Sequence, residues 1–473
     1  MKSRILTLGI LLFSAAAPAM TLDWAGTYRF EWMQVDRPSL GTPGWSKAYG
    51  LNYLRLSPKI IATDGVTIHS AFDVLANEDA AYTNQQFGQL WGQSLPAGAD
   101  DSRSNTLSQT KGTTTLRVSE LYMHVQQEYG SLIVGRAPYE FGLGISYNAG
   151  RGLFDHWHTS MDLVGYKFIV GNLSFMPMIG RVAAADAGLA NTVQDQIFEF
   201  LYDSKDTGST IGAVISRRQS SPGNNDTPFS AAPKADMIGG AGATRADAYS
   251  MQTTSFILKR EWESFKFRME GSFLSGSYGV RTLEGDEVKN NSYGIAMEMD
   301  FPRPEGKWDA SVRLGVASGD DPKTKDNWEG FTFHRNYDVA MLLFNHRLGG
   351  ADFLRTNLIK DTSVHDVSNS LDDEAISNAV YLSPKIRYGW SERWDIVNSL
   401  TYAQLMVNPT NSVDFKKDLG LEWDIGLIYK PRENMRWENQ LGLLFPGAAF
   451  KDGTVDRPNG FTYGFSTRAA ITF

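Results

Sequence analysis

The sequence contains no cysteine and, beyond its first residues, no long apolar run. Without cysteine there is no disulfide, no thiolate nucleophile and no cysteine-ligated zinc site. A spanning helix needs about 18 or more consecutive apolar residues, so a helical membrane protein is excluded. An excess of positive charge is also missing, because the formal net charge is −8 over 473 residues. We therefore expect no nucleic-acid partner.

The first 19 residues have the composition of a secretory signal peptide. Lys2 and Arg4 precede an apolar run over 5–13, and Ala17-Pro18-Ala19 supplies an A-x-A end. A positive segment, a short apolar segment and small residues at the end are typical of a signal that is removed on export. We expect cleavage near Ala19, which leaves a mature domain over 20–473. An uncleaved anchor helix is the alternative, and the short apolar run disfavours it.

Alternation of apolar and polar residues is the dominant pattern along the chain. Between 418 and 430, Leu421, Trp423 and Ile425 alternate with Glu422 and Asp424. A period of two indicates a β-strand with two different faces. Many of these segments continue for ten or more residues, whereas strands of soluble proteins average about 5–6. A tilted strand that crosses a bilayer needs about 9–11 residues.

The connections between these segments alternate between tight turns and long polar stretches. Short turns at one rim and long loops at the other are typical of outer-membrane barrels. Tryptophans such as Trp262, Trp308 and Trp390 lie beside the tight turns, as expected for an aromatic girdle at a membrane interface. We predict an all-β fold, a closed antiparallel transmembrane barrel of about 18 strands, with short periplasmic turns and long extracellular loops. The predicted strands are 23–36, 48–61, 66–76, 112–127, 131–138, 161–170, 173–183, 194–203, 209–218, 248–260, 262–275, 291–301, 307–317, 376–389, 393–407, 417–430, 434–446 and 460–473.

Two features of this assignment leave alternatives open. The patterns over 66–76 and 131–138 are weak, so about 16 strands is the alternative count. The apolar segment 337–345 lies inside the longest polar stretch, and we expect it to be part of a loop that folds back on the barrel rather than an additional strand. The long polar stretches are 77–111, 139–160, 219–247, 277–290 and 318–375.

The chain ends in an amphipathic segment whose last residue is phenylalanine. Such a terminal strand resembles the pattern that the barrel assembly machinery of the outer membrane reads in bacterial barrels; an ordinary edge strand is the alternative. We therefore expect the outer membrane of a Gram-negative bacterium, with its lipid and lipopolysaccharide, as the surroundings. The predicted assembly signal consists of Phe461, Tyr463, Phe465, Ile471 and Phe473.

Three stretches resemble the alginate-export type of outer-membrane porin. They are ELYMHVQQEYGSLIVGRAPYEFGLG (120–144), LGVASGDDPKTKDNWEGFTF (314–333) and LGLEWDIGLIYKPRENMRWENQLGLLFPGAAF (419–450). In that family a G-x-L-x-x-GR strand follows an E-x-Y strand, an ASGD loop follows a late strand, and an E-x-D strand pairs with one that ends in F-P-G. The resemblance implies a porin barrel, monomeric in the best-known members. A polyanion exporter needs a strongly basic lumen, whereas the lumen predicted here is mixed in charge.

The polar faces of the predicted strands should surround a water-filled lumen. Backbone groups cannot stay unpaired in lipid, so the barrel must close. A charge that faces lipid near the midplane costs about 2–4 kcal/mol, so charged residues should point inward. A barrel of this size is wide enough for a channel. The predicted pore-lining residues are Arg29, Glu31, Arg55, Lys59, Lys266, Arg268, Glu270, Glu298, Asp300, Asp309, Arg313, Lys385, Arg387, Asp395, Asp418, Glu422, Asp424, Arg436, Glu438 and Arg468.

Opposite charges are unevenly distributed among these residues. Rows of opposite sign would produce a transverse field that favours polar solutes. Salt bridges that stiffen the wall are the alternative. Basic residues gather on the strands of Arg268 and Lys385, and acidic residues on those of Glu298, Asp418, Glu422 and Asp424.

Candidates for chemistry outside the wall are few. His156 and His158 could share a metal ion, but no third ligand is nearby in the sequence, so a histidine pair in a loop is favoured. A catalytic pair of His158 with Ser160, as in a barrel phospholipase, is disfavoured because this barrel is large. Asp320, Asp321 and Asp326 could bind Ca²⁺, although their spacing is not that of an EF-hand. We expect no catalytic residue, and no cofactor apart from this possible Ca²⁺.

Two classes of function remain open from the sequence. The favoured one is a porin, a passive diffusion channel for small hydrophilic or charged solutes, and not an enzyme. The alternative is a plugged barrel with a structural or adhesive role, which acts through its long extracellular loops. The sequence leaves open whether the protein is a monomer or a homotrimer.

Overall fold

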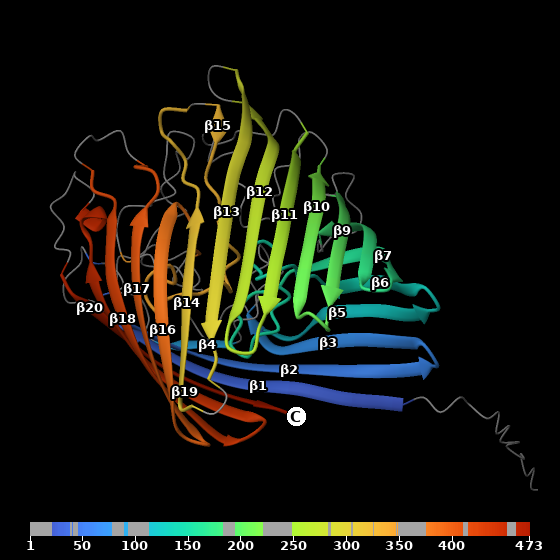
Figure 1. Cartoon of the computed structure of the whole chain (residues 1–473), viewed down its shortest axis with the longest axis horizontal. Coiled ribbons are helices and arrows are strands. Elements are labelled where there is room, and N and C mark those ends of the chain that lie inside the picture. The colour runs from blue at the N-terminus through green and yellow to red at the C-terminus, as the bar shows by residue number, and fades with distance from the viewer. Residues whose placement is uncertain are drawn as a thin grey trace, which may run out of the picture.

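The fold is a closed antiparallel β-barrel of 18 strands. The computed structural model describes residues 21–37, 40, 46–77, 89–92, 113–182, 194–220, 248–281, 285–303, 306–324, 326–346, 348, 375–409, 415–451 and 460–473. Each wall strand pairs with its neighbours in the chain, and β20 pairs with β1 to close the sheet (Figure 1). The weak patterns over 66–76 and 131–138 are strands, so the prediction of about 18 is confirmed rather than 16. Residues 1–19, where the signal peptide is predicted, lie outside the described residues.

The wall strands and their bounds follow the predicted ranges closely. They are β1 (Thr21–Val35), β2 (Lys47–Thr63), β3 (Val66–Asn77), β5 (Thr113–Gln127), β6 (Gly130–Pro138), β7 (Ser160–Val170), β8 (Leu173–Val182), β9 (Gln194–Ser204), β10 (Ser209–Gln219), β11 (Ser250–Glu261), β12 (Lys266–Arg281), β13 (Glu287–Phe301), β14 (Trp308–Ala317), β16 (Ala379–Ser391), β17 (Trp394–Leu405), β18 (Asp418–Arg432), β19 (Met435–Pro446) and β20 (Thr462–Thr472). Two short strands, β4 (Gln89–Gly92) and β15 (Asn327–Trp328), pair with β2 and β13 in the loops. The 3-10 helix η3 (Ala448–Lys451) follows β19. None of the described helical turns is long and apolar enough to cross a membrane.

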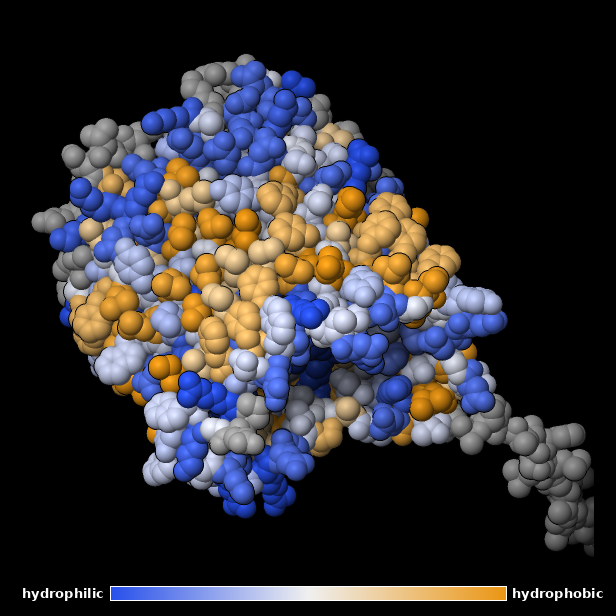
Figure 2. Space-filling model, in the orientation of Figure 1, coloured by the Kyte–Doolittle hydropathy of each residue, from blue (hydrophilic) through white to orange (hydrophobic). Residues whose placement is uncertain are grey.

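Alternation along each strand separates an outer apolar face from an inner polar face. On β17 and β18, the outward Leu400 and Trp423 are 43% and 42% exposed, whereas the adjacent Thr401 and Glu422 are fully buried. On the face shown in Figure 2, the outward side chains form a band of apolar surface with polar surface above and below it. This is the distribution that a bilayer requires of a transmembrane barrel.

Aromatic side chains collect at the end of the barrel where the tight turns lie. Trp24, Trp262, Trp308, Trp390 and Trp437 are all between 44% and 62% exposed beside these turns. Amphipathic rings prefer the boundary between lipid and water, so these residues mark one membrane interface.

The loops at the opposite end differ in one place from the prediction. The stretch 277–290 is not a long loop, because β12 continues to Arg281 and β13 begins at Glu287. This hairpin rises above its neighbours, and β15 lies beside its upper end (Figure 1). The predicted loops over 77–111 and 219–247 lie mostly outside the described residues.

The closing seam between β20 and β1 depends on the last residue. The Phe473 N–H donates to the Gly26 carbonyl at 3.0 Å, and the Gly26 N–H donates to the Phe473 carbonyl at 2.8 Å. The Phe473 ring lies over Gly26, where a Cβ would stand only 2.5 Å from the ring atom Cζ. The absence of a side chain at Gly26 therefore makes room for the terminal aromatic ring at the seam.

We predict that deletion of Phe473 lowers the yield of assembled barrel several-fold, because it removes both seam hydrogen bonds and the ring over Gly26. Heat-modifiable gel mobility measures the assembled fraction. Phe445→Ala is the control, since Phe445 is also outward and 51% exposed but lies on β19, outside the predicted assembly signal. Equal assembled yields for the deletion, the control and the unmodified chain would contradict the prediction.

Candidate functional site

Two loops from the long-loop end fold into the barrel and occupy its middle. We call residues 139–159, between β6 and β7, lumen loop 1, and residues 329–346, between β14 and β16, lumen loop 2. Leu342 and Leu343 of lumen loop 2 are no more than 2% exposed and belong to an apolar core inside the barrel. Segment 337–345 forms no strand, so the prediction that it folds back on the barrel is confirmed.

Lumen loop 1 is attached to the wall through Glu270 of β12. One carboxylate oxygen, Oε2, accepts hydrogen bonds from the backbone N–H groups of Leu143 at 2.6 Å and Ile145 at 3.3 Å. Gly142 has a φ of 68°, and a Cβ on it would stand 2.6 Å from the same oxygen. The loop can therefore wrap around the carboxylate only because this position is glycine.

Lumen loop 2 is attached in the same way through Glu422 of β18. Its Oε1 accepts from the N–H groups of Met341 at 2.9 Å and Leu342 at 2.6 Å, and its Oε2 accepts from Leu343 at 2.7 Å. On the opposite side of the same segment, the hydroxyl groups of Ser383 and Thr401 donate to the Val339 carbonyl.

Asn336 joins the two loops to each other. Its Oδ1 accepts from the N–H groups of His156 at 3.2 Å and Trp157 at 3.0 Å. Its Nδ2 donates to the Trp157 carbonyl at 2.6 Å and to Asn148 Oδ1 at 3.2 Å. The guanidinium of Arg335 lies 4.2 Å from the centre of the Trp157 ring. The loops thus form one connected structure across the lumen.

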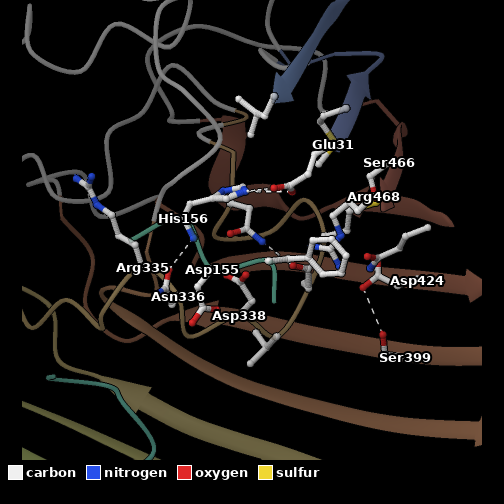
Figure 3. Close-up of a pocket in the computed structure, with 18 of the residues that line it drawn as sticks. Glu31, Asp155, His156, Arg335, Asn336, Asp338, Ser399, Asp424, Ser466 and Arg468 are labelled. Carbon is white, nitrogen blue, oxygen red and sulfur yellow. Dashed lines mark hydrogen bonds and ion pairs between the residues drawn. The ribbon is translucent and has the colours of Figure 1, made fainter. Parts of the chain in front are cut away.

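A polar cavity of about 250 Å³ lies between the joined loops and the wall strands β1, β2, β14 and β16–β20. Figure 3 shows that His156 points toward Glu31, and that Asp424 and Ser399 approach each other from neighbouring strands. The cavity carries both signs of charge. Its acidic lining residues are Glu31, Asp155, Asp338 and Asp424, and its basic lining residues are His156, Arg313, Arg335, Lys385 and Arg468.

Several of these charges are matched by neighbours. Glu31 lies 2.9 Å from Arg29 and 3.0 Å from His156, and Arg468 lies 2.7 Å from Glu438. Among the described residues, no ion pair within 4.0 Å involves Lys385 or Asp338. These two side chains therefore offer opposite charges to a solute in the cavity.

The predicted pore-lining residues have three different placements in the structure. Five of them line the cavity, namely Glu31, Arg313, Lys385, Asp424 and Arg468. Others form ion pairs along the inner wall, among them Arg55–Glu120, Arg268–Glu298, Arg268–Asp300, Arg387–Asp309, Arg387–Asp395, Arg436–Glu438 and, beside Glu261, Lys266. Glu270 and Glu422 hold the loops. Whether the cavity residues govern conduction stays a prediction.

The inward assignment of Asp418 is wrong. The pairing of β17 with β18 shifts between Ala403 and Gln404, so that Asp418 lies opposite the exposed Gln404 instead of on the inner face. Gly420 makes this bulge possible with a φ of 100°. A bulge adds one residue to a strand and so reverses the parity beyond it.

The other predicted sites show no assembled chemistry among the described residues. His156 forms a hydrogen bond with Glu31, and His158 is only 1% exposed. Burial, with Arg117 and Arg55 nearby, lowers the pKa of His158 well below its usual value, so this imidazole is neutral near pH 7. Asp320 Oδ1 accepts from the Glu329 N–H, and Asp321 Oδ1 from the Lys323 N–H. In the part of the chain that the structure describes, no three histidine, aspartate or glutamate side chains lie close enough together to hold a metal ion, and this includes Asp326.

Sequence reasoning missed the cavity residues that come from the lumen loops. Asp155, Arg335, Asn336 and Asp338 lie in irregular segments, where no periodicity reveals which way a side chain points. The only signal was the apolar segment 337–345 within a polar loop. It placed lumen loop 2 against the barrel but did not identify its contacts.

Solved bacterial proteins share this fold, among them the following three. OccK11 (OpdR) of Pseudomonas aeruginosa is 8% identical with a TM-score of 0.50, and the match covers 96% of each chain. OccK5 (OpdH) of the same organism is 9% identical with a TM-score of 0.50, over 96% of this chain and 98% of that one. OccAB1 of Acinetobacter baumannii is 9% identical with a TM-score of 0.51, over 96% of each chain. No protein-family model and no curated protein matches the sequence. This likeness shows the fold, an 18-stranded barrel that matches outer-membrane porin structures.

We predict that Asp424→Asn shifts ion preference toward anions and Lys385→Gln toward cations, because both side chains line the cavity. Reversal potentials across a salt gradient measure the shift. It should fade as salt rises, since the Debye length falls from about 10 Å at 0.1 M to about 3 Å at 1 M. Asp418→Asn is the matched control and should leave the potential unchanged. A shift for Asp418→Asn equal to that for Asp424→Asn would contradict the assignment of faces.

Proposed function

We propose that the protein is an outer-membrane porin, a passive diffusion channel for small hydrophilic or charged solutes. The observation that carries this proposal is a charged cavity of about 250 Å³ within a closed barrel whose outer surface is an apolar band. Such a wall separates a polar path inside the barrel from the lipid outside, as a diffusion channel requires.

The orientation in the membrane follows from the two rims. The tight turns with their exposed tryptophans would face the periplasm, and the long-loop end, from which both lumen loops enter the barrel, would face outward. This is the usual arrangement of outer-membrane barrels. A cleaved signal peptide, as expected from residues 1–19, would direct export of the chain from the cytoplasm.

The cavity favours small solutes over a polymer. The sequence resembles alginate-export porins, but a polyanion exporter needs a strongly basic lumen. The cavity instead carries carboxylates, those of Glu31, Asp338 and Asp424, among its cationic side chains. Lys385 and Asp338, for which no ion pair is present among the described residues, suit a small polar solute better, because each can interact with the solute as it passes.

A plugged barrel with a structural or adhesive role is the competing function. The lumen loops pack against the wall inside the barrel. Both a plugged barrel and a narrow channel would have such loops. The two functions differ in one measurable property, since only a channel carries ionic current.

We predict discrete current steps when the purified protein is inserted into a planar lipid bilayer. Ser399→Trp should lower the step size severalfold, because Ser399 lines the cavity from β17 and a bulky ring there would narrow it. Leu400→Trp is the matched control: Leu400 is the next residue, points outward and is 43% exposed, so its variant should conduct normally. Absence of steps from assembled protein would favour the plugged barrel.

A further inference from the structure

We infer that Glu270 and Glu422 set the width of the passage by holding the lumen loops in place, and that their charges do not act on permeating ions. This inference rests on the proposed channel function. It gives these carboxylates a role different from that of Asp424, which lies two residues from Glu422 on the same face of β18.

The surroundings of Glu422 are those of a structural anchor. The residue is fully buried, and both carboxylate oxygens accept backbone N–H groups from three consecutive residues, Met341 to Leu343. Successive N–H groups form a concave site for oxygen acceptors. Both carboxyl oxygens of Glu422 are occupied by the loop backbone, and the residue is fully buried, so a passing ion does not contact it.

Glu270 repeats this arrangement on another arc of the wall. It is fully buried on β12, and β13, β14, β16 and β17 separate it from β18. Its Oε2 accepts N–H groups from Leu143 and Ile145 of lumen loop 1. Each loop is thus held by a carboxyl group of the wall that accepts loop N–H groups, through Oε2 alone in Glu270 and through both oxygens in Glu422.

The wall is shaped to receive lumen loop 2 beside its anchor. Gly442 and Gly464 pair across β19 and β20. A Cβ on Gly442 would stand 3.0 Å from Met341 Sδ, and one on Gly464 would stand 2.7 Å from Leu342 Cδ2. These glycines leave space for the side chains of the residues whose N–H groups bind Glu422. The position of the loop is therefore fixed both by hydrogen bonds and by shape.

Loss of one anchor should affect the whole passage. Lumen loop 2 contributes Asp338 to Met341 to the cavity, and Met341 is the first of the three residues that Glu422 holds. Asn336 ties this loop to His156 and Trp157 of lumen loop 1 (Figure 3). A loop released from Glu422 would therefore move cavity residues from both loops.

Glu422→Gln and Glu422→Asp separate anchoring from charge. The amide of Gln places an N–H₂ group against N–H donors, and Asp is one methylene too short to reach the loop, so both variants should loosen it. We expect a severalfold rise in open-channel current noise for both, with reversal potentials equal to that of the unmodified channel. Lys385→Gln is the control, because Lys385 lines the cavity from β16, and we expect a shifted potential with unchanged noise.

An engineered disulfide tests whether any added noise comes from the released loop. The chain has no cysteine, so Leu342→Cys with Gly464→Cys introduces a single possible pair at a close contact between loop and wall. In the Glu422→Gln background, oxidation of this pair should return the noise to the level of the unmodified channel, and reduction should restore it.

Each outcome of this experiment has a definite meaning. If Glu422→Gln shifts the reversal potential while Glu422→Asp behaves like the unmodified channel, Glu422 acts as a pore charge and the inference is wrong. If both variants assemble and remain as quiet as the unmodified channel, the anchor role is also wrong. If the unmodified protein gives no current, the proposed channel function fails before the variants are compared. Glu270→Gln and Glu270→Asp provide the same comparison for lumen loop 1.

Discussion

Backbone hydrogen bonding in lipid is the constraint on which the rest of this structure depends. A strand edge left open in the bilayer would expose N–H and C=O groups that cost several kcal/mol each, so the sheet must close on itself. Here β20 meets β1, and Gly26 accepts the last residue of the chain at that seam. Closure then dictates the two faces of every strand, with an apolar band outside and a polar lining inside.

A barrel of this width needs further structure to be selective. Porins with about 16–18 strands enclose an aqueous channel, and here two loops fold inward to narrow it. A hydrogen bond typically contributes about 0.5–1.5 kcal/mol, so the three N–H groups on Glu422 together hold lumen loop 2 firmly against the wall. Rigid loops, rather than the wall alone, therefore define the path that a solute would follow.

The fold could be predicted from sequence largely because a period of two carries information along a whole strand. The strand ranges, the closed barrel and the inward fold of segment 337–345 were all accessible in this way. Asp418 was misplaced because the bulge at Gly420 shifts the parity, and a bulge leaves no trace in the alternation. The roles of Glu270 and Glu422 were not accessible, since parity shows that a carboxylate points inward but not that a distant loop surrounds it.

The central claim is that the lumen loops are held as firmly as the wall. Hydrogen–deuterium exchange of the protein in lipid tests it most directly, at the amides of Leu143, Met341, Leu342 and Leu343. These amides lie outside every wall strand, yet each donates to a buried carboxylate. We expect protection comparable to that of strand amides such as those of β18. Exchange as fast as that of exposed turn residues would show that the loops are not anchored and would contradict this account.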